Sequence, residues 1–216
     1  SKMAVRWYAL LDADDRGRHG STIYDYKSRI KTHVVKALGT CSPVLTVPQL
    51  RAFFRDLKSR RSASTTRNCA NALTAMLDDA MAEGWIPRGE NPMRSREVRD
   101  VLPTVESPDP EDIVALPLAT VRSLLAWPTL PDERRGLYLL AVTSGMRAGE
   151  LWGILRGRID LDGEIPAVNV AEQLCYPRGK EVPAKLGPLK SRWCRRTMPL
   201  HPAALKWVKA RAEGMA

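Results

Sequence analysis

A charged side chain stands at an unusual place in this chain, just after a glycine break and at the start of a helix expected over residues 146–155. The segment from Thr143 runs Thr-Ser-Gly-Met-Arg-Ala-Gly-Glu-Leu-Trp, so that Arg147 precedes Glu150 by one helical turn. The N-terminus of a helix carries a partial positive charge and free backbone N–H groups, so this place suits an anion such as a phosphate. Glu150 is spaced to orient the guanidinium. On spacing alone, an ordinary surface ion pair between the two residues is the simpler interpretation.

Lysine and arginine side chains gather in two further places, each of which contains a single acidic residue. The first basic cluster consists of Arg51, Arg55, Lys58, Arg60, Arg61 and Arg67. The second basic cluster consists of Arg178, Lys180, Lys185, Lys190, Arg192, Arg195 and Arg196. Such clusters are typical of contacts with the phosphates of double-stranded DNA, which give an affinity that falls steeply with salt. A solvated basic face is an equally good interpretation for any one residue.

Recognition of bases in the major groove needs a helix with suitable side chains. The helix expected to begin at Ser64 carries Arg67 and Asn68 near its start. Arginine and asparagine are the usual readers of guanine and adenine. These two residues are therefore the candidates for contacts with bases.

The composition favours a soluble protein with a nucleic-acid partner and excludes several other classes. The chain of 216 residues has 34 Lys and Arg against 24 Asp and Glu, a net charge of +10, and 44% hydrophobic residues, enough for a folded core. Its longest apolar run, residues 137–142, is far shorter than a membrane helix. The four cysteines form no C-x-x-C pair and have no histidines at ligand spacing. We therefore expect neither a metal nor a disulfide framework, and a reducing cytoplasm fits best.

The N-terminal half has the periodicity of a small helical bundle. Apolar residues recur at three- and four-residue steps in three segments that begin at Thr22, Thr46 and Ser64. The bundle is assigned to residues 21–92, with the first helix over 22–38. Residues 1–20 fit either a strand or a short helix and are left open.

Residues 93–117 are rich in proline and acid, so we expect a linker there. Beyond it, residues 118–216 alternate between short helical segments and short runs with strand character. The expected helices begin near residues 120, 132, 146 and 202, and the expected strands cover 159–161, 168–174 and 195–200. The predicted fold class is mainly α with a small antiparallel β-sheet, arranged as a helical bundle joined by a linker to an α+β domain.

The segment around Arg147 resembles the first catalytic box of the tyrosine recombinase, or phage integrase, family. That box has the pattern T-G-hydrophobic-R-x-x-E-hydrophobic, followed by an aspartate near Asp160. Residues 188–200 resemble the β-hairpin of the family, in which a lysine precedes a basic strand that ends in R-x-hydrophobic-P-L. The N-terminal half resembles its core-binding domain. The resemblance covers residues 21–202 and implies a core-binding domain followed by part of a catalytic domain.

The resemblance also implies roles for individual residues. In this family a tyrosine attacks a DNA phosphodiester without metal or cofactor, giving a 3′-phosphotyrosyl intermediate, while fixed cations stabilise the charge on the non-bridging oxygens. Arg147 matches one of these cations, which binds the phosphate oxygens, and Glu150 matches the residue that positions the arginine. Lys190 matches the lysine that protonates the leaving 5′ oxygen, with Lys185 or Lys180 as the counterpart if the hairpin register differs.

The remaining catalytic residues of the family have no counterpart in this chain. An H-x-x-R box and a nucleophile are expected after the hairpin, whereas the tyrosines precede it or lie at its start: Tyr8, Tyr24, Tyr26, Tyr138 and Tyr176. We therefore expect a chain that binds DNA without cleaving it, as part of a longer integrase or as a shortened, non-catalytic DNA-binding or regulatory protein. An unrelated helical regulator with a coincidental box is the third alternative. Recombination in the family takes place in a tetramer of protomers on DNA, and we expect this chain alone to be a monomer.

Overall fold

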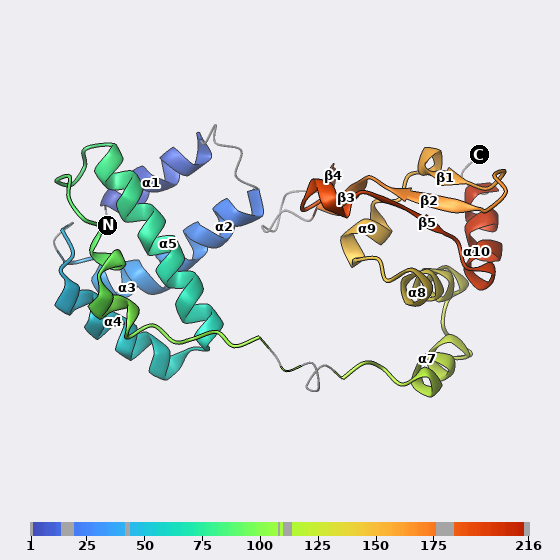
Figure 1. The fold of residues 1–216 in the computed structure, drawn as a ribbon, viewed down its shortest axis with the longest axis horizontal. Helices are drawn as coiled ribbons and strands as arrows, with labels where there is room; N and C mark the ends of the chain where they lie inside the picture. The colour runs from blue at the N-terminus through green and yellow to red at the C-terminus, as the bar shows by residue number, and fades with distance from the viewer. Residues whose placement is uncertain are drawn as a thin grey trace. The chain divides into compact units, whose positions relative to one another are not determined.

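The computed structural model describes residues 2–13, 20–41, 44–107, 109, 114–175 and 184–213. The chain forms two compact units, Ser1–Pro110 and Glu111–Ala216 (Figure 1). Helices dominate both units, and all the strands in the described part of the chain belong to the second unit. The predicted class, mainly α with small antiparallel sheet structure, is confirmed.

The first unit is a helical bundle that contains α5 (Ala63–Ala82) as its longest helix. One face of α5 is buried along its length, because Cys69, Leu73, Leu77 and Ala80 recur at three- and four-residue steps. The other elements of this unit are α1 (Lys2–Asp12), α2 (Gly20–Arg29), η1 (Ile30–Val34), α3 (Val35–Leu38), α4 (Val47–Arg60), η2 (Pro92–Arg94) and α6 (Arg96–Arg99).

Capping residues fix where the two longest helices of this unit begin. The side chain of Gln49 accepts a hydrogen bond from the backbone N–H of Thr46 at 2.9 Å, and Thr46 caps α4 as the sequence predicts. The Ser62 hydroxyl accepts from the N–H of Thr65 at 3.2 Å, so α5 begins directly after Ser62. The chain leaves α5 through Gly84, whose φ of 69° few residues other than glycine adopt.

The helix expected over residues 22–38 is interrupted. A π-helical turn, η1, separates α2 from α3, and the N–H of Val35 donates to the carbonyl oxygen of Ile30, five residues earlier. Ile30 and Val34 are both buried, so the wider turn keeps both side chains in the core. Turns of this kind occur frequently at functional sites.

The N-terminal segment that the sequence leaves open forms helix α1 and packs into the core of the first unit. Trp7 of α1 is fully buried, and its Nε1 donates to Oδ2 of Asp79 at 2.8 Å. The indole also stacks on Tyr26, with ring centroids 5.9 Å apart. An indole that is buried and hydrogen-bonded in this way ties α1 to both α2 and α5.

The first residues of the expected linker also belong to this unit. Met93, Val98 and Val101 are buried in the same core as Trp7. The side chain of Asn91 caps η2 by accepting from the N–H of Met93 at 2.9 Å. The folded unit therefore extends on both sides of the interval 21–92 that the sequence assigns to it.

The second unit packs helices against a three-stranded antiparallel sheet in the order β1–β2–β5, and a separate antiparallel pair joins β3 to β4. Val168 and Val170 of β2 are buried together with Leu140 of α8 and Val208 of α10. The elements of this unit are α7 (Leu118–Leu125), α8 (Asp132–Ser144), α9 (Ala148–Trp152), η4 (Arg156–Arg158), β1 (Ile159–Asp160), β2 (Ala167–Val170), β3 (Glu172–Cys175), β4 (Lys185–Pro188), η5 (Arg192–Cys194), β5 (Arg196–Pro199) and α10 (Pro202–Glu213).

Two segments of this unit differ from their sequence-based prediction. The strand expected over 168–174 divides at Ala171 into β2 and β3, which belong to different sheets. The helix expected over 146–155 is shorter, because the chain leaves α9 at Gly153. Strand β4 has no alternating apolar pattern, so the sequence does not indicate it.

No helix in the described ranges is both long enough and apolar enough to cross a membrane. All four cysteines are free thiols. Among the residues that the structure describes, no three His, Cys, Asp or Glu side chains are grouped as a metal site requires.

The burial of Trp7 predicts that α1 is an integral part of the first unit. Trp7→Ala leaves a large cavity in the core, so we expect it to lower the free energy of unfolding by about 3–5 kcal/mol. Val5 lies on the same helix and is 66% exposed, and Val5→Ala is therefore the matched control, with an expected change within about 0.5 kcal/mol. Urea denaturation followed by far-ultraviolet circular dichroism measures both. Equal, small effects of the two variants would show that α1 is not part of the cooperative core.

Candidate active site

Arg147 and Glu150 are joined at the start of α9 by two hydrogen bonds, both donated by Arg147. The backbone of Arg147 is extended, with φ of −69° and ψ of 151°, and its N–H donates to Oε2 of Glu150 at 3.0 Å. The guanidinium of the same arginine donates from Nη1 to Oε1 of Glu150, also at 3.0 Å. One carboxylate therefore fixes both the backbone and the side chain of Arg147.

A second guanidinium approaches the same carboxylate from the sheet. Nη2 of Arg196 donates to Oε2 of Glu150 at 2.8 Å, and its Nη1 donates to the carbonyl oxygen of Cys194 at 2.9 Å. Arg196 pairs with Val170 in the ladder between β5 and β2, so the two side chains share the covered face of the sheet. The sequence predicts Arg196 as a contact to DNA, whereas the structure turns this side chain toward Glu150.

The carboxylate at this junction is buried, and both its oxygens are hydrogen-bonded. Glu150 is only 1% exposed. Burial by itself would raise the pKa of Glu150, but hydrogen bonds from Arg196, then from the backbone and side chain of Arg147, hold that pKa below its ordinary value. The carboxylate is therefore ionised at neutral pH, and two arginines balance its charge.

The guanidinium of Arg147 faces solvent on its other side. The side chain is 62% exposed, although hydrogen bonds to Cys194 and Glu150 raise the pKa of Arg147 and orient it. A guanidinium has five N–H donors in a planar fork that matches the oxygens of a phosphate. Among the residues that the structure describes, Glu150 and Cys194 bind only Nη1, so donors on the remaining nitrogens are available to an anion.

Cys194 connects Arg147 to the hairpin segment that includes Lys190. Its Sγ lies 3.5 Å from Nη1 of Arg147 and 3.3 Å from the hydroxyl oxygen of Ser191. The hydrogen bond with Ser191 lowers the pKa of the Cys194 thiol, burial opposes this, and the hydrogen bond from Arg147 lowers it further. Nothing in the sequence pattern pointed to Cys194, because its contacts depend on the fold of η5.

Lys190 lies in the turn between β4 and η5, with an exposed side chain. The residue before it, Leu189, is buried in the core of the second unit and anchors this turn. The residue after it, Ser191, contacts Cys194, which in turn contacts Arg147. The structure thus places the two residues of the predicted catalytic pair, Arg147 and Lys190, in adjoining segments of one unit.

Two glycines let α9 lie directly on β3, which sets the position of Arg147 above the hairpin. A Cβ atom on Gly153 would come within 2.7 Å of Cα of Gln173 and 2.8 Å of the nitrogen of Leu174. A Cβ on Gly149 would come within 3.1 Å of the Leu174 carbonyl oxygen. Any larger side chain at Gly153 would push the helix away from the strand.

The remaining members of the second basic cluster are mostly at the surface. Arg192 stacks on the indole of Trp193, with its guanidinium carbon 4.6 Å from the ring centroid. Trp193 is 80% exposed, and the sequence-based list of site residues does not contain it. Lys185 and Arg195 are exposed, and Arg178 and Lys180 lie outside the described residues.

Several members of the first basic cluster are used to hold the first unit together. Arg67 donates from Nη2 to the carbonyl oxygen of Pro103 at 2.8 Å, and Lys58 donates to the carbonyl oxygen of Val101 at 3.4 Å. Arg60 is paired with Asp56 on the same helix. Asn68 is partly exposed and contacts Ser64, Arg51 is partly buried, and Arg55 and Arg61 are exposed.

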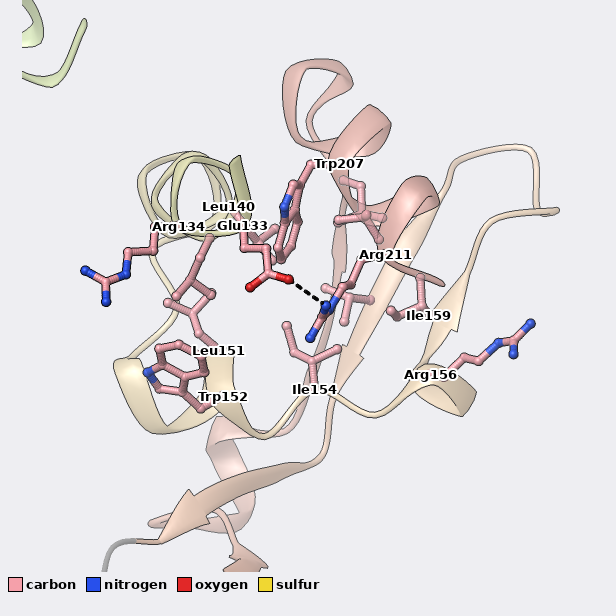
Figure 2. Close-up of a pocket in the computed structure, with 14 residues that line it drawn as sticks. Glu133, Arg134, Leu140, Leu151, Trp152, Ile154, Arg156, Ile159, Trp207 and Arg211 are labelled. Atoms are coloured by element: carbon pink, nitrogen blue, oxygen red, sulfur yellow. Dashed lines mark hydrogen bonds and ion pairs between the residues drawn. The ribbon is translucent and has the colours of Figure 1, made fainter. Parts of the chain in front are cut away.

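A hollow of about 320 Å³ lies elsewhere in the second unit, between α8, α9, the sheet and α10 (Figure 2). Most of its lining is apolar, as in Leu140, Leu151 and Ile154. Figure 2 shows Glu133 and Arg211 joined by an ion pair beside the indole of Trp207, with a distance of 3.2 Å between the charged atoms. The residues that line it include no serine, cysteine, histidine or lysine, and the carboxylate of Glu133 is paired with Arg211, so the chemistry is expected at Arg147 instead.

No protein-family model matches the chain, and no curated protein sequence matches it. Solved structures do match. The integrase of transposon Tn1549 in complex with transposon right-end DNA is similar over 96% of this chain, with a TM-score of 0.71 and 19% sequence identity. A lambda integrase dimer bound to a COC′ core site is similar over 99% of this chain, with a TM-score of 0.65 and 18% identity.

This chain therefore has the fold of these integrases, as the resemblance to the tyrosine recombinase family predicts. It spans 64% of the Tn1549 integrase chain and 69% of the lambda integrase chain. The similarity includes both compact units, because it covers nearly the whole of this chain.

The buried carboxylate predicts a specific effect on stability. Glu150→Gln removes the charge that holds two guanidinium groups, so we expect the free energy of unfolding to fall by about 2–3 kcal/mol. In the folded protein the pKa of Glu150 is lowered. The stability difference between wild type and variant is therefore complete above the ordinary glutamate pKa of about 4.3, and it is lost as the pH falls through the pKa of the folded protein. Chemical denaturation of both proteins over a series of pH values measures it.

Glu133→Gln is the matched control, because Glu133 also pairs with an arginine but is 78% exposed. We expect its effect to stay below about 1 kcal/mol at every pH. A Glu150→Gln variant that is as stable as this control would contradict the central position of the carboxylate.

Proposed function

We propose that this chain is the DNA-binding portion of a site-specific recombinase of the tyrosine recombinase type, containing its core-binding domain and the first part of its catalytic domain. The integrase fold supports the proposal, since the similar Tn1549 and lambda integrases were solved in complex with DNA. The net charge of +10 supports a polyanionic partner. Other protomers of the same protein, on the same DNA, are the second class of partner.

The observation that contributes most to the proposal is the exposed guanidinium of Arg147, which the buried carboxylate of Glu150 holds in place. Phosphoryl transfer builds charge on the non-bridging oxygens of the phosphate, and donors that are already fixed in place stabilise that charge without reorganisation. Glu150 and Cys194 fix Arg147 before any DNA is bound. A free surface arginine would have to lose side-chain entropy on binding, so the support makes Arg147 a better clamp.

Lys190 has the second chemical role in the proposal. Lys190 lies on the exposed turn after β4, and in the complete recombinase its ammonium group would protonate the 5′ oxygen that leaves during strand cleavage. Glu150 and Arg196 are positioning residues, because they act on the phosphate only through Arg147. The nucleophile of the reaction is a tyrosine that follows the hairpin in the family. Tyr138, the one tyrosine in the described part of the second unit, lies on α8 and precedes the hairpin. In the proposal, this chain therefore binds the DNA without cutting it.

The proposal predicts that Arg147 contributes one phosphate contact. Arg147→Ala should weaken binding to a short duplex about tenfold and reduce the slope of log affinity against log salt by about one. Fluorescence anisotropy of a labelled duplex over a range of salt concentrations measures both quantities.

Arg134→Ala is the matched control, since Arg134 is an exposed arginine of the same unit but lines the apolar hollow. We expect it to change the affinity less than about twofold, because a charge away from the interface is screened. Equal losses of affinity in the two variants would show that Arg147 contributes only to the overall positive charge and makes no specific phosphate contact. A wild-type protein that binds no duplex would overturn the proposed function itself.

A further inference from the structure

A second hollow of about 300 Å³ lies in the first unit, between the π-helical turn η1, helix α3 and the C-terminal end of α4. Its apolar lining comes from Phe53 and Leu57, which are 5% and 2% exposed and belong to the core. The polar and charged residues that line it are Thr32, His33, Lys36, Arg60 and Arg61. The hollow thus combines an apolar base with cationic side chains from α3, from α4 and from Arg61, which follows α4.

The positive charge around this hollow is mostly unbalanced. Arg60 is paired with Asp56, one turn earlier on α4. Lys36 and Arg61 are exposed, and neither side chain has an ion pair with another residue of the described ranges. Three cations face one acid, and like charges held together in this way repel unless an anion is bound between them.

His33 belongs to η1 and lines this hollow. Burial lowers the pKa of His33, and the charges of Arg61, Arg29, Arg60 and Lys36 lower it further. Arg29 belongs to α2, and no charged side chain of α5, which packs on η1 from the other side, acts on the imidazole. The ring is therefore neutral at neutral pH while the hollow is empty, and an anion among these cations would favour its protonated form.

We propose that this hollow is a phosphate-binding site, in which Lys36, Arg60 and Arg61 supply the charge and His33 takes up a proton when the phosphate binds. The inference rests on the proposed function, because the DNA backbone is the source of phosphate to which we assign the site. A phosphate diester fits the site better than a carboxylate, since its oxygens accept from several donors arranged around it.

Proton uptake links DNA affinity to pH in a defined direction. If bound phosphate raises the pKa of His33 by about one unit, the affinity rises as the pH falls through the interval between the free and the bound value. The maximum gain is about tenfold, because one pKa unit corresponds to a factor of ten in the binding constant. Above that interval His33 is neutral in both states, and the affinity does not depend on it.

The chain has only three histidines, His19, His33 and His201, so their ring signals can be followed separately by NMR. The His33 signal is assigned with the variant His33→Gln and titrated against pH in the free protein, with a short DNA duplex, and with inorganic pyrophosphate. We expect the duplex to raise the pKa of His33 by about one unit and to leave that of the exposed His201 unchanged. In Arg61→Ala the rise should become smaller, since one of the phosphate partners is removed.

Anisotropy measurements on the same duplex complete the test and separate the two proposals. Wild-type protein should gain affinity as the pH is lowered from about 8 past the ordinary histidine pKa of about 6.5, because the free His33 titrates below that value. The variant His33→Gln should gain less, and His201→Gln should behave as wild type. A duplex that binds without moving the His33 titration would overturn this inference and leave the proposed function intact. A rise with pyrophosphate but not with bound duplex would overturn the assignment to DNA in favour of a free polyphosphate. Absence of any duplex binding would overturn the proposed function, and a pyrophosphate response would then still support an anion site.

Discussion

A charge that is removed from water must be balanced where it lies, and this constraint organises the second unit around Glu150. The carboxylate is 1% exposed and accepts hydrogen bonds from two guanidinium groups and one backbone N–H. One of its partners, Arg147, precedes α9 and faces solvent, whereas the other, Arg196, belongs to β5 and faces inward. The same carboxylate therefore joins the start of a helix to a strand, and it leaves one guanidinium available for a ligand.

The rest of the unit is arranged so that this junction can form. The alternation of β5 turns Arg196 to the covered face, where the pairing of β5 with β2 aligns it with Val170. Helix α9 rests closely on β3 through Gly149 and Gly153, because neither glycine has a Cβ that would meet the strand. The hairpin then continues into the turn with Lys190, which Leu189 anchors in the core. Together these contacts, most of them between residues far apart in the sequence, hold the lysine and the exposed arginine in adjoining segments.

How much of this could be predicted depends on whether the signal is local in the sequence. The start of α4 at Thr46 and the pairing of Arg147 with Glu150 depend on residues three positions apart, and the sequence predicts both. The role of Arg196 could not be predicted from its neighbours in the sequence. It lies among several basic residues, and only the strand pairing determines which of them points inward. Helix α1 was left open for a similar reason, since Trp7 finds its partner Asp79 far along the chain. The expectation that Lys190 acts together with Arg147 depends on resemblance to a family, because the two residues are 43 positions apart in the sequence.

The account as a whole depends on Arg147 being a preformed contact for a DNA phosphate. The most direct measurement is the structure of this chain bound to a short duplex, in particular the distance between the Arg147 guanidinium and the nearest phosphate oxygen. We expect a hydrogen bond of about 2.7–2.9 Å, with Glu150 still held by Arg196. A duplex bound with Arg147 turned to solvent, or with its carboxylate support broken, would contradict the account.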